Sequence, residues 1–172
     1  MRFGDFLKAT VLLSAGCATL LAFVTILGIT QEDDRVVIYV TAGWWVLATV
    51  IGISLGARSA ASPPIARLLA GARTQTTLPE LNPGTTMLNR LWPLLVATIG
   101  AAALSFVEPQ VSSVAAGFTI IWALAWRTQE RAVLAIEERD GVRFYVDRTS
   151  PLQPIQLVRT PGFGGEYLSR TG

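Results

Sequence analysis

The sequence predicts an all-α membrane protein: a four-helix transmembrane bundle with both termini in the cytoplasm, a short interfacial helix and a small cytoplasmic tail. The first observation is composition, because 51% of the 172 residues are hydrophobic and only 15% are charged. The second is that four long stretches contain no Asp, Glu, Lys or Arg. A charge at the centre of a bilayer costs about 2.5–3.5 kcal/mol, so such stretches suit hydrocarbon. The charge-free stretches are residues 9–29, 36–57, 91–107 and 109–126.

The third observation is the position of the basic residues. When successive segments alternate between the two sides of a membrane, 13 of the 14 Lys and Arg residues fall on one side and only Arg35 falls on the other. Cytoplasmic loops are enriched in Lys and Arg, so this distribution places both termini and the middle loop in the cytoplasm. The predominance of Arg over Lys, with abundant Ala and Gly, is typical of a GC-rich bacterial genome. We therefore expect a multi-pass protein of the bacterial cytoplasmic (inner) membrane, with a membrane domain over residues 1–126 and a cytoplasmic tail over residues 127–172.

The first span is predicted over residues 9–29, but the N-terminus has a second interpretation. Met1 to Cys17 resembles a lipoprotein signal peptide, because a basic start and an apolar run precede the tetrapeptide Ser-Ala-Gly-Cys. However, the usual Leu three positions before the Cys is Ser14 here, and apolar residues continue through Leu27. An uncleaved signal-anchor helix accounts for the same residues, and we favour it.

The second and third spans carry small residues at one-turn spacing. Lipid tails are as apolar as Leu, so spans associate through close packing and hydrogen bonds, which small residues permit. The third span is predicted over residues 87–107, because Thr85 or Thr86 can cap a helix that begins at Met87 and contains Pro93. Its partner is either a neighbouring span or a second copy of the chain. The predicted helix-packing residues are Ala48, Gly52 and Gly56 in the second span and Ala97, Ala101 and Ser105 in the third.

The cytoplasmic loop over residues 58–90 is too long for a simple turn. Ser62 followed by two prolines predicts the start of a short helix, with Ile65, Leu68, Leu69 and Ala72 on one side. Such a short helix is marginal in water, so we expect the headgroup plane to stabilise it. Asn82-Pro83-Gly84 then predicts a type II turn before the third span.

The fourth span, residues 109–126, is predicted to continue as a helix through Thr128 and Glu130. Asp140-Gly141 offers a turn between residues 133–138 and 142–146; we expect a helix and then a small hairpin, a strand over 133–138 being the alternative. The rest of the tail is stiff and apolar, which predicts an extended arm that docks on its own loop, on another copy or on a different protein. The predicted docking residues are Pro151, Pro154, Ile155, Leu157, Val158 and Phe163.

The tryptophans fall into two groups. Trp92 and Trp126 lie at the predicted cytoplasmic ends of the third and fourth spans, as in an aromatic belt. Trp44, Trp45 and Trp122 lie deeper; they either line a lipid or substrate cavity or, more commonly for tryptophan, face lipid or fill the bundle.

Catalytic chemistry has one candidate. Gly52 to Gly56 matches the GxSxG pattern of serine hydrolases, with Ser54 as nucleophile and Lys8, the one Lys, as the conceivable base, since the chain has no His. The nucleophile elbow requires a strand turning into a helix, whereas Ser54 lies in a predicted helix whose glycines the packing stripe already explains. We expect no catalytic residue.

Other chemistries find little support in the sequence. A single Cys, Cys17, and the lack of His make a zinc site or other metal chemistry improbable. We expect no cofactor and no nucleic acid, because Gly162 to Gly165 does not complete a nucleotide-binding motif and the basic residues are dispersed. A permeation pathway would need an intramembrane charge or a set of hydroxyls. The candidate hydroxyls are Thr10, Ser14, Thr19, Thr25, Thr49, Ser54, Thr98, Ser105 and Thr119.

The sequence thus predicts a non-enzymatic structural or accessory subunit of the membrane whose cytoplasmic tail docks on a protein partner or on a second copy. An oligomeric channel or transporter component is the alternative, and a Ser-Lys membrane hydrolase is a remote third.

Overall fold

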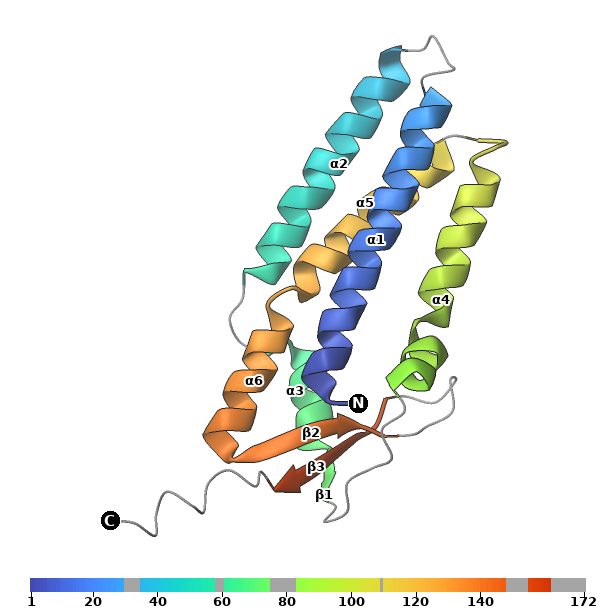
Figure 1. Cartoon of the computed structure of the whole chain (residues 1–172). Helices are drawn as coiled ribbons and strands as arrows, with labels where there is room; N and C mark the ends of the chain where they lie inside the picture. Colours follow the sequence, from blue (N-terminus) through green and yellow to red (C-terminus); the bar gives the residue numbers. More distant parts are fainter. Residues whose placement is uncertain (30–34, 58–60, 75–82, 109, 148–154, 162–172) are drawn as a thin grey trace. The chain divides into compact units, whose positions relative to one another are not determined.

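The computed structural model describes residues 1–29, 35–57, 61–74, 83–108, 110–147 and 155–161 (Figure 1). Helices account for 79% of these residues, so the chain is mostly helical, as the sequence predicts. The helices are α1 (Phe3–Ile29), α2 (Arg35–Gly56), α3 (Pro63–Ala70), α4 (Pro83–Leu104), α5 (Gln110–Trp126) and α6 (Gln129–Asp140). The strands are β1 (Arg73–Thr74), β2 (Val142–Val146) and β3 (Leu157–Pro161).

Three helices, α1, α2 and α4, are long and apolar enough to cross a membrane. α5 also contains no Asp, Glu, Lys or Arg, but it is the shortest of the four predicted spans. Its 17 residues extend about 25 Å, slightly less than the roughly 30 Å of a hydrocarbon core.

Two helices begin earlier than predicted. α1 begins at Phe3, because an apolar cluster of Phe3, Phe6 and Leu7 is buried and adds a turn and a half before the predicted span. α4 begins at Pro83, which corrects both the turn predicted at residues 82–84 and the cap predicted at Thr85 or Thr86. Proline suits the first turn of a helix, where its missing N–H is not needed, and this preference outweighs the turn pattern.

The chain divides into two compact units. The first contains residues 1–8, 59–90 and 128–172; the second contains residues 9–58 and 91–127. The first unit therefore combines the predicted cytoplasmic tail with the middle loop and the N-terminus, while the second contains the charge-free stretches.

Three distant segments build the small sheet of the first unit. Its strand order is β1-β3-β2, with β3 parallel to β1 and antiparallel to β2. The N-terminus extends this layer along β2, because Arg2 forms a bridge with Tyr145 and the Met1 carbonyl accepts a hydrogen bond from β2 (3.0 Å). The N-terminus, the middle loop and the tail are thus joined by backbone hydrogen bonds.

A buried carboxylate also ties the N-terminus to the tail. Arg2 Nη2 lies 3.2 Å from Glu137 Oε2, and the Phe144 N–H donates to Glu137 Oε1 (2.9 Å). The Glu137 side chain is only 6% exposed, so these two donors compensate for its burial. By contrast, Arg139 and Asp140 form an exposed pair. The hydrogen bond from Arg139 is the main cause of the lowered pKa of Asp140, but an ion pair on the surface adds little stability.

Helix α3 starts after Ser62 with prolines in its first two positions, as predicted. Its apolar face is covered by protein, since Ile65 is 0% exposed and Leu69 is 9% exposed. This burial corrects the expectation that the headgroup plane stabilises the helix. The Ser62 N–H also donates to the Gln129 side-chain oxygen (2.8 Å), which connects α3 to the start of α6.

The first part of the tail differs from the prediction. α5 ends at Trp126 and α6 begins at Gln129, so the fourth helix does not run unbroken through Thr128 and Glu130. The break follows the change from an apolar to a polar sequence. The predicted helix over residues 133–138 is confirmed, and it ends at Gly141, whose φ of +62° is a left-handed conformation that favours glycine. The turn at residues 140–141 therefore joins a helix to β2, and the strand partner of β2 is β3.

Candidate functional site at the α2–α5 interface

The closest helix pairing of the second unit is between α2 and α5, which run parallel. Thr41 pairs with Ser113 near the start of both helices, and Gly52 lies against Ile121 and Leu124 further along. Residue numbers rise together along both helices, which is the signature of a parallel pair.

Glycines bring the last turns of the two helices into close contact. A Cβ added to Gly52 would lie 2.8 Å from the Leu124 Cβ, and one added to Gly56 would overlap the Leu124 carbonyl oxygen. Ala48, one turn before Gly52, is 0% exposed. The stripe predicted in the second span therefore lies at this interface, although its role in holding the spans together stays a prediction.

The stripe predicted in the third span is arranged differently. Ala97 is exposed and Ala101 is half-buried. Ser105 lies just past the end of α4 at Leu104 and is buried, and its hydroxyl donates to the Ala102 carbonyl (2.6 Å). Whether this stripe packs against another copy stays a prediction.

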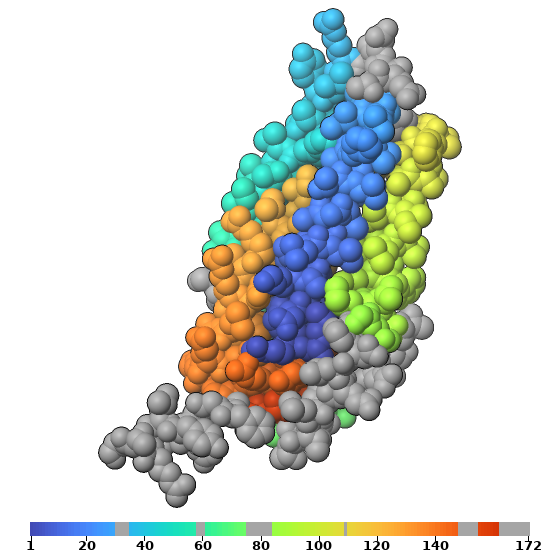
Figure 2. Space-filling view, viewed as in Figure 1, coloured from blue at the N-terminus to red at the C-terminus, as the bar shows by residue number. Residues whose placement is uncertain are grey.

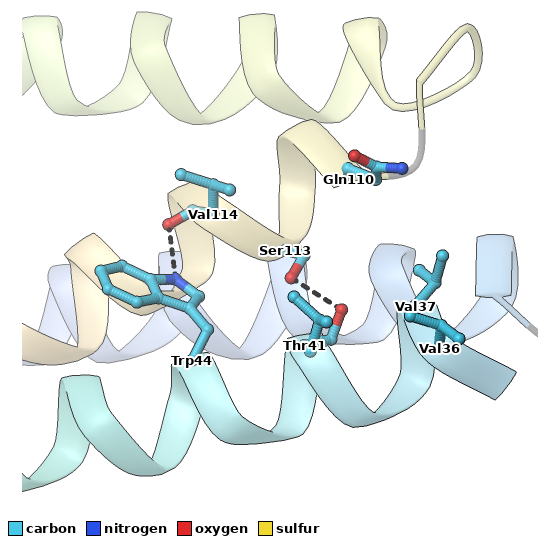
Figure 3. Close-up of a pocket in the computed structure, with 8 residues that line it drawn as sticks. Val36, Val37, Thr41, Trp44, Gln110, Ser113 and Val114 are labelled. Atoms are coloured by element: carbon cyan, nitrogen blue, oxygen red, sulfur yellow. Dashed lines mark hydrogen bonds between the residues drawn. The ribbon is translucent and has the colours of Figure 1, made fainter.

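Hydrogen bonds hold the first turns of α2 and α5 (Figure 3). The Ser113 hydroxyl donates to the Thr41 hydroxyl (3.1 Å), and the Trp44 indole N–H donates to the Val114 carbonyl (3.3 Å). The Trp45 indole N–H donates to the Ser113 carbonyl (3.0 Å). Trp44 lies against Gly117, where a Cβ would overlap its indole. Trp44 and Trp45 thus act as hydrogen-bonded wedges between the helices, whereas Trp122 is 50% exposed and stacks on Trp126 of its own helix.

Helix α1 joins the same cluster through one pair of hydroxyls. The Thr25 hydroxyl lies 2.9 Å from the Ser112 hydroxyl of α5 and 2.7 Å from the Leu21 carbonyl of its own helix. Both Thr25 and Ser112 are 0% exposed.

A cavity of about 460 Å³ lies between the first turns of α2 and α5. α2 supplies Val36, Val37, Val40, Thr41 and Trp44, and α5 supplies Gln110, Ser113 and Val114. In Figure 3 the Thr41–Ser113 and Trp44–Val114 bonds lie along one part of the wall, while Val36, Val37 and Gln110 lie toward the helix starts. Most of the lining is therefore aliphatic or aromatic.

Many apolar side chains of the second unit are exposed. Several lie on α2 and α4, whose surfaces are partly visible in Figure 2 in cyan and yellow-green. On α2 they include Tyr39 (75% exposed) and Val46 (65%), and on α4 they include Ile99 (66%). In water such a surface would be highly unfavourable, whereas in hydrocarbon it needs no cover.

The nine hydroxyls named above as candidates for a pathway are all engaged in hydrogen bonds. Thr49 donates to the Trp45 carbonyl (2.8 Å), and Thr98 donates to the Leu94 carbonyl (2.8 Å). The remaining seven candidates also have partners, which for all but Thr10 are carbonyls three or four residues earlier in the chain: Thr10, Ser14, Thr19, Thr25, Ser54, Ser105 and Thr119. This pattern satisfies polar groups in an apolar surrounding.

Ser54 lies inside α2 and not on a strand-to-helix turn. Its hydroxyl is exposed and donates to the Ile51 carbonyl (2.8 Å). Lys8 belongs to the first unit and Ser54 to the second. Within the described residues, three or more Cys, Asp or Glu side chains nowhere converge on a common point.

The predicted docking residues belong to the first unit. Leu157 (3% exposed) and Val158 (0% exposed) are buried in β3, between β1 and β2, and Ile155 is half-buried. The described part of the tail thus docks on its own loop and on β2, which is the intramolecular alternative. Pro151, Pro154 and Phe163 lie outside the described residues.

The α5 side of the interface was missed by the sequence reasoning. Its buried small residues are Ser112, Ser113, Ala116, Gly117 and Ala123. Ser112 and Ala116 are four residues apart, and so are Ser113 and Gly117. The same spacing of small residues predicted the stripes in the second and third spans, so it could have predicted this face of α5 as well.

The arrangement offers tight helix packing and an apolar cavity, and it brings no nucleophile and base together among the described residues. Comparison with protein-family models, with curated proteins and with solved structures finds no match to this chain. Its function is therefore inferred from its own residues.

Proposed function

We propose that this chain is a four-span protein of the bacterial cytoplasmic membrane, with both termini in the cytoplasm, that acts as a non-enzymatic accessory subunit. The main support for this topology is the make-up of the first unit, which is assembled from three segments that the predicted spans separate.

Backbone pairing supports an even number of crossings. β1 of the middle loop pairs with β3 of the tail, and the N-terminus pairs with β2. Segments that share a sheet lie on the same side of a membrane. α1 and α2 come between the N-terminus and the loop, and α4 and α5 come between the loop and the tail. If α4 crosses the membrane, α5 must return across it.

The parallel pairing of α2 and α5 supports the same conclusion for the shortest span. From Thr41 to Gly56, α2 advances about 22 Å along its axis while it remains beside α5. A helix in contact with a membrane span over most of the hydrocarbon thickness lies at the same depth. α5 therefore counts as a span despite its 17 residues.

The orientation follows from charge. The segments of the first unit, with the ends of the adjoining spans, carry 13 of the 14 basic residues, and such an excess favours the cytoplasmic side.

An accessory role is the function that the described residues favour. The spans contain no Asp, Glu, Lys or Arg in their central portions, and their hydroxyls are engaged by helix carbonyls or neighbouring side chains. Proton relays and ion pathways use intramembrane charges, and a serine nucleophile needs a base. Packing groups, in contrast, are plentiful along α2 and α5.

Cysteine labelling tests the topology. In a Cys17→Ala background, single cysteines replace Asp5, Arg67 and Arg139 in the first unit and Arg35 and Gln110 at the helix starts of the second. We expect a membrane-impermeant maleimide, added to intact spheroplasts, to label only Cys at positions 35 and 110. Labelling of any first-unit position before lysis, with the cells shown to be sealed, would overturn the proposed orientation.

Two further measurements test the accessory role. Mild-detergent purification of the full chain should recover a defined protein partner or homo-oligomer, and the same sample in liposomes should conduct neither ions nor small solutes. Selective flux through the purified protein would favour the channel alternative. Hydrolytic activity lost in a Ser54→Ala variant would favour the enzyme.

A further inference from the structure

We propose that the cavity between the first turns of α2 and α5 holds one acyl chain of a phospholipid from the outer leaflet, an inference that rests on the proposed four-span topology. The cavity exists because the two helices are held differently along their length. Gly52 and Gly56 allow backbone contact at one end, whereas valines and the Trp44 indole occupy the space at the other.

The walls suit hydrocarbon better than water. Most of the polar groups on the wall are paired with one another, since Ser113 donates to Thr41 (3.1 Å) and Trp44 donates to the Val114 carbonyl (3.3 Å); the Gln110 amide lies at the start of α5. A buried water needs two to four polar partners, and the Ser113 hydroxyl and the Trp44 indole have already donated their hydrogens within the wall. Apart from Gln110 at the start of α5, the rest of the wall is valine and indole surface (Figure 3).

The cavity is large enough for a chain and has an apolar rim. Its volume of about 460 Å³ falls within the range of ligand-binding pockets. Val36 and Val40 are each 66% exposed and Val114 is 48% exposed, so the rim is open to the surroundings of the helices. In the proposed topology those surroundings are lipid tails.

Polar residues at the helix starts suit a phospholipid headgroup. Arg35 directly precedes Val36, and Gln110 is the first residue of α5; both side chains are exposed. In the proposed orientation they lie at the outer surface, where a guanidinium pairs with a phosphate and an amide donates to an ester carbonyl. The tail enters the cavity from this end.

Photolabelling of the full chain tests the proposal. The protein is reconstituted in phosphatidylglycerol vesicles that contain a trace of phosphatidylglycerol with a diazirine near the middle of one tail, and labelled peptides are identified by mass spectrometry. We expect label concentrated on the first turns of α2 and α5. Val37→Phe with Val114→Phe fills the cavity and should reduce this labelling about tenfold, the effect of excluding a few buried methylene groups.

Val46→Phe is the matched control, because Val46 lies on α2, is 65% exposed and does not line the cavity. Its labelling should equal that of the wild type. Equal labelling of the filled variant and the control would mean bulk lipid only and would overturn the proposal.

Native mass spectrometry of the wild type provides a second measurement that needs no variant. After exchange into lipid-free detergent, we expect one phospholipid to remain bound, and Arg35→Gln should reduce its retention. A chain that proves integral to the membrane with both termini cytoplasmic but retains no lipid contradicts only this inference. Termini on opposite sides would contradict the proposed function instead.

Discussion

Gly56 and Gly43 show how differently two glycines of one helix are placed. At Gly56 the α5 backbone occupies the space that a side chain would need, whereas nothing lies within 4 Å of a Cβ at Gly43. Both residues are in α2 with helical backbone, so conformational freedom does not distinguish them. The difference is contact alone.

We expect Gly56→Ala to destabilise the α2–α5 pair by about 1–3 kcal/mol, the usual cost of overpacking, because the added methyl group meets the Leu124 carbonyl. Gly43→Ala adds the same group in open space and should leave the stability unchanged or slightly raised. Thermal unfolding of the purified protein in detergent measures both. Equal midpoints for the two variants would show that close packing at Gly56 is unimportant.

Glu137 is the residue whose loss should most affect the first unit. Replacement by Ala leaves the Phe144 N–H without its acceptor, which costs about 1–3 kcal/mol, and removes the partner of Arg2. Glu137→Gln retains an acceptor oxygen and should cost less. Limited proteolysis of the solubilised protein measures the loss, with the exposed neighbour Glu138→Ala as control. Identical protease sensitivity of Glu137→Ala and Glu138→Ala would contradict this prediction.

At the scale of elements, α2 and α5 form a parallel pair with a defined register. Hydroxyls 3.1 Å apart at Thr41 and Ser113 set the register at one end, and the glycine contacts set it at the other. In the proposed four-span topology, parallel neighbours require a crossing between them, and α4 is the helix assigned to it.

A disulfide can report this register directly. In a Cys17→Ala background, Thr41→Cys with Ser113→Cys should cross-link under mild oxidation, since the parent hydroxyls are in contact. Thr41→Cys with Thr119→Cys places the second thiol about 9 Å further along α5 and should not. Proteolysis in the middle loop followed by gel electrophoresis detects the bond between fragments. Efficient cross-linking of the second pair instead would refute the register.

At the scale of the whole molecule, the tail forms part of the core of the first unit. β3 is the central strand of the sheet in the first unit, and it brings Leu157 and Val158 into the core. The N-terminal residues belong to the same unit, so cleavage before Cys17 would remove part of it. This membership favours the uncleaved signal-anchor interpretation.

Two truncations separate the structural part of the tail from the rest. A chain that stops after Gln156 lacks β3 and should lose the fold of the first unit, because two buried aliphatic side chains contribute about 1.5–3 kcal/mol each. That loss is comparable with a typical total stability of roughly 5–15 kcal/mol. A chain that stops after Pro161 keeps β3 and should retain the fold. Trypsin resistance of the solubilised chains measures both, and resistance in the shorter one would disprove the structural role of β3.

Sequence reasoning located the helices well and their partners poorly. The charge-free stretches predicted α1, α2, α4 and α5 to within a few residues at most ends, and the prolines after Ser62 predicted α3. The predicted start of α4 was wrong because a proline can occupy the first turn of a helix as well as a β-turn. The apolar composition of the tail predicted that Leu157 and Val158 dock, but it left three partners open. No local pattern singled out the middle loop, since β1 contributes only two residues.

Membrane character and helix position were readable from the chain alone, because the free energy of transfer into hydrocarbon accumulates residue by residue along a continuous stretch. The pairing of α2 with α5, the joining of the N-terminus, loop and tail in one sheet, and the apolar cavity were decided only in three dimensions. Each depends on contacts between residues tens of positions apart. Small residues at four-residue spacing mark the contacting faces of α2 and α5, but that local spacing does not say which face meets which.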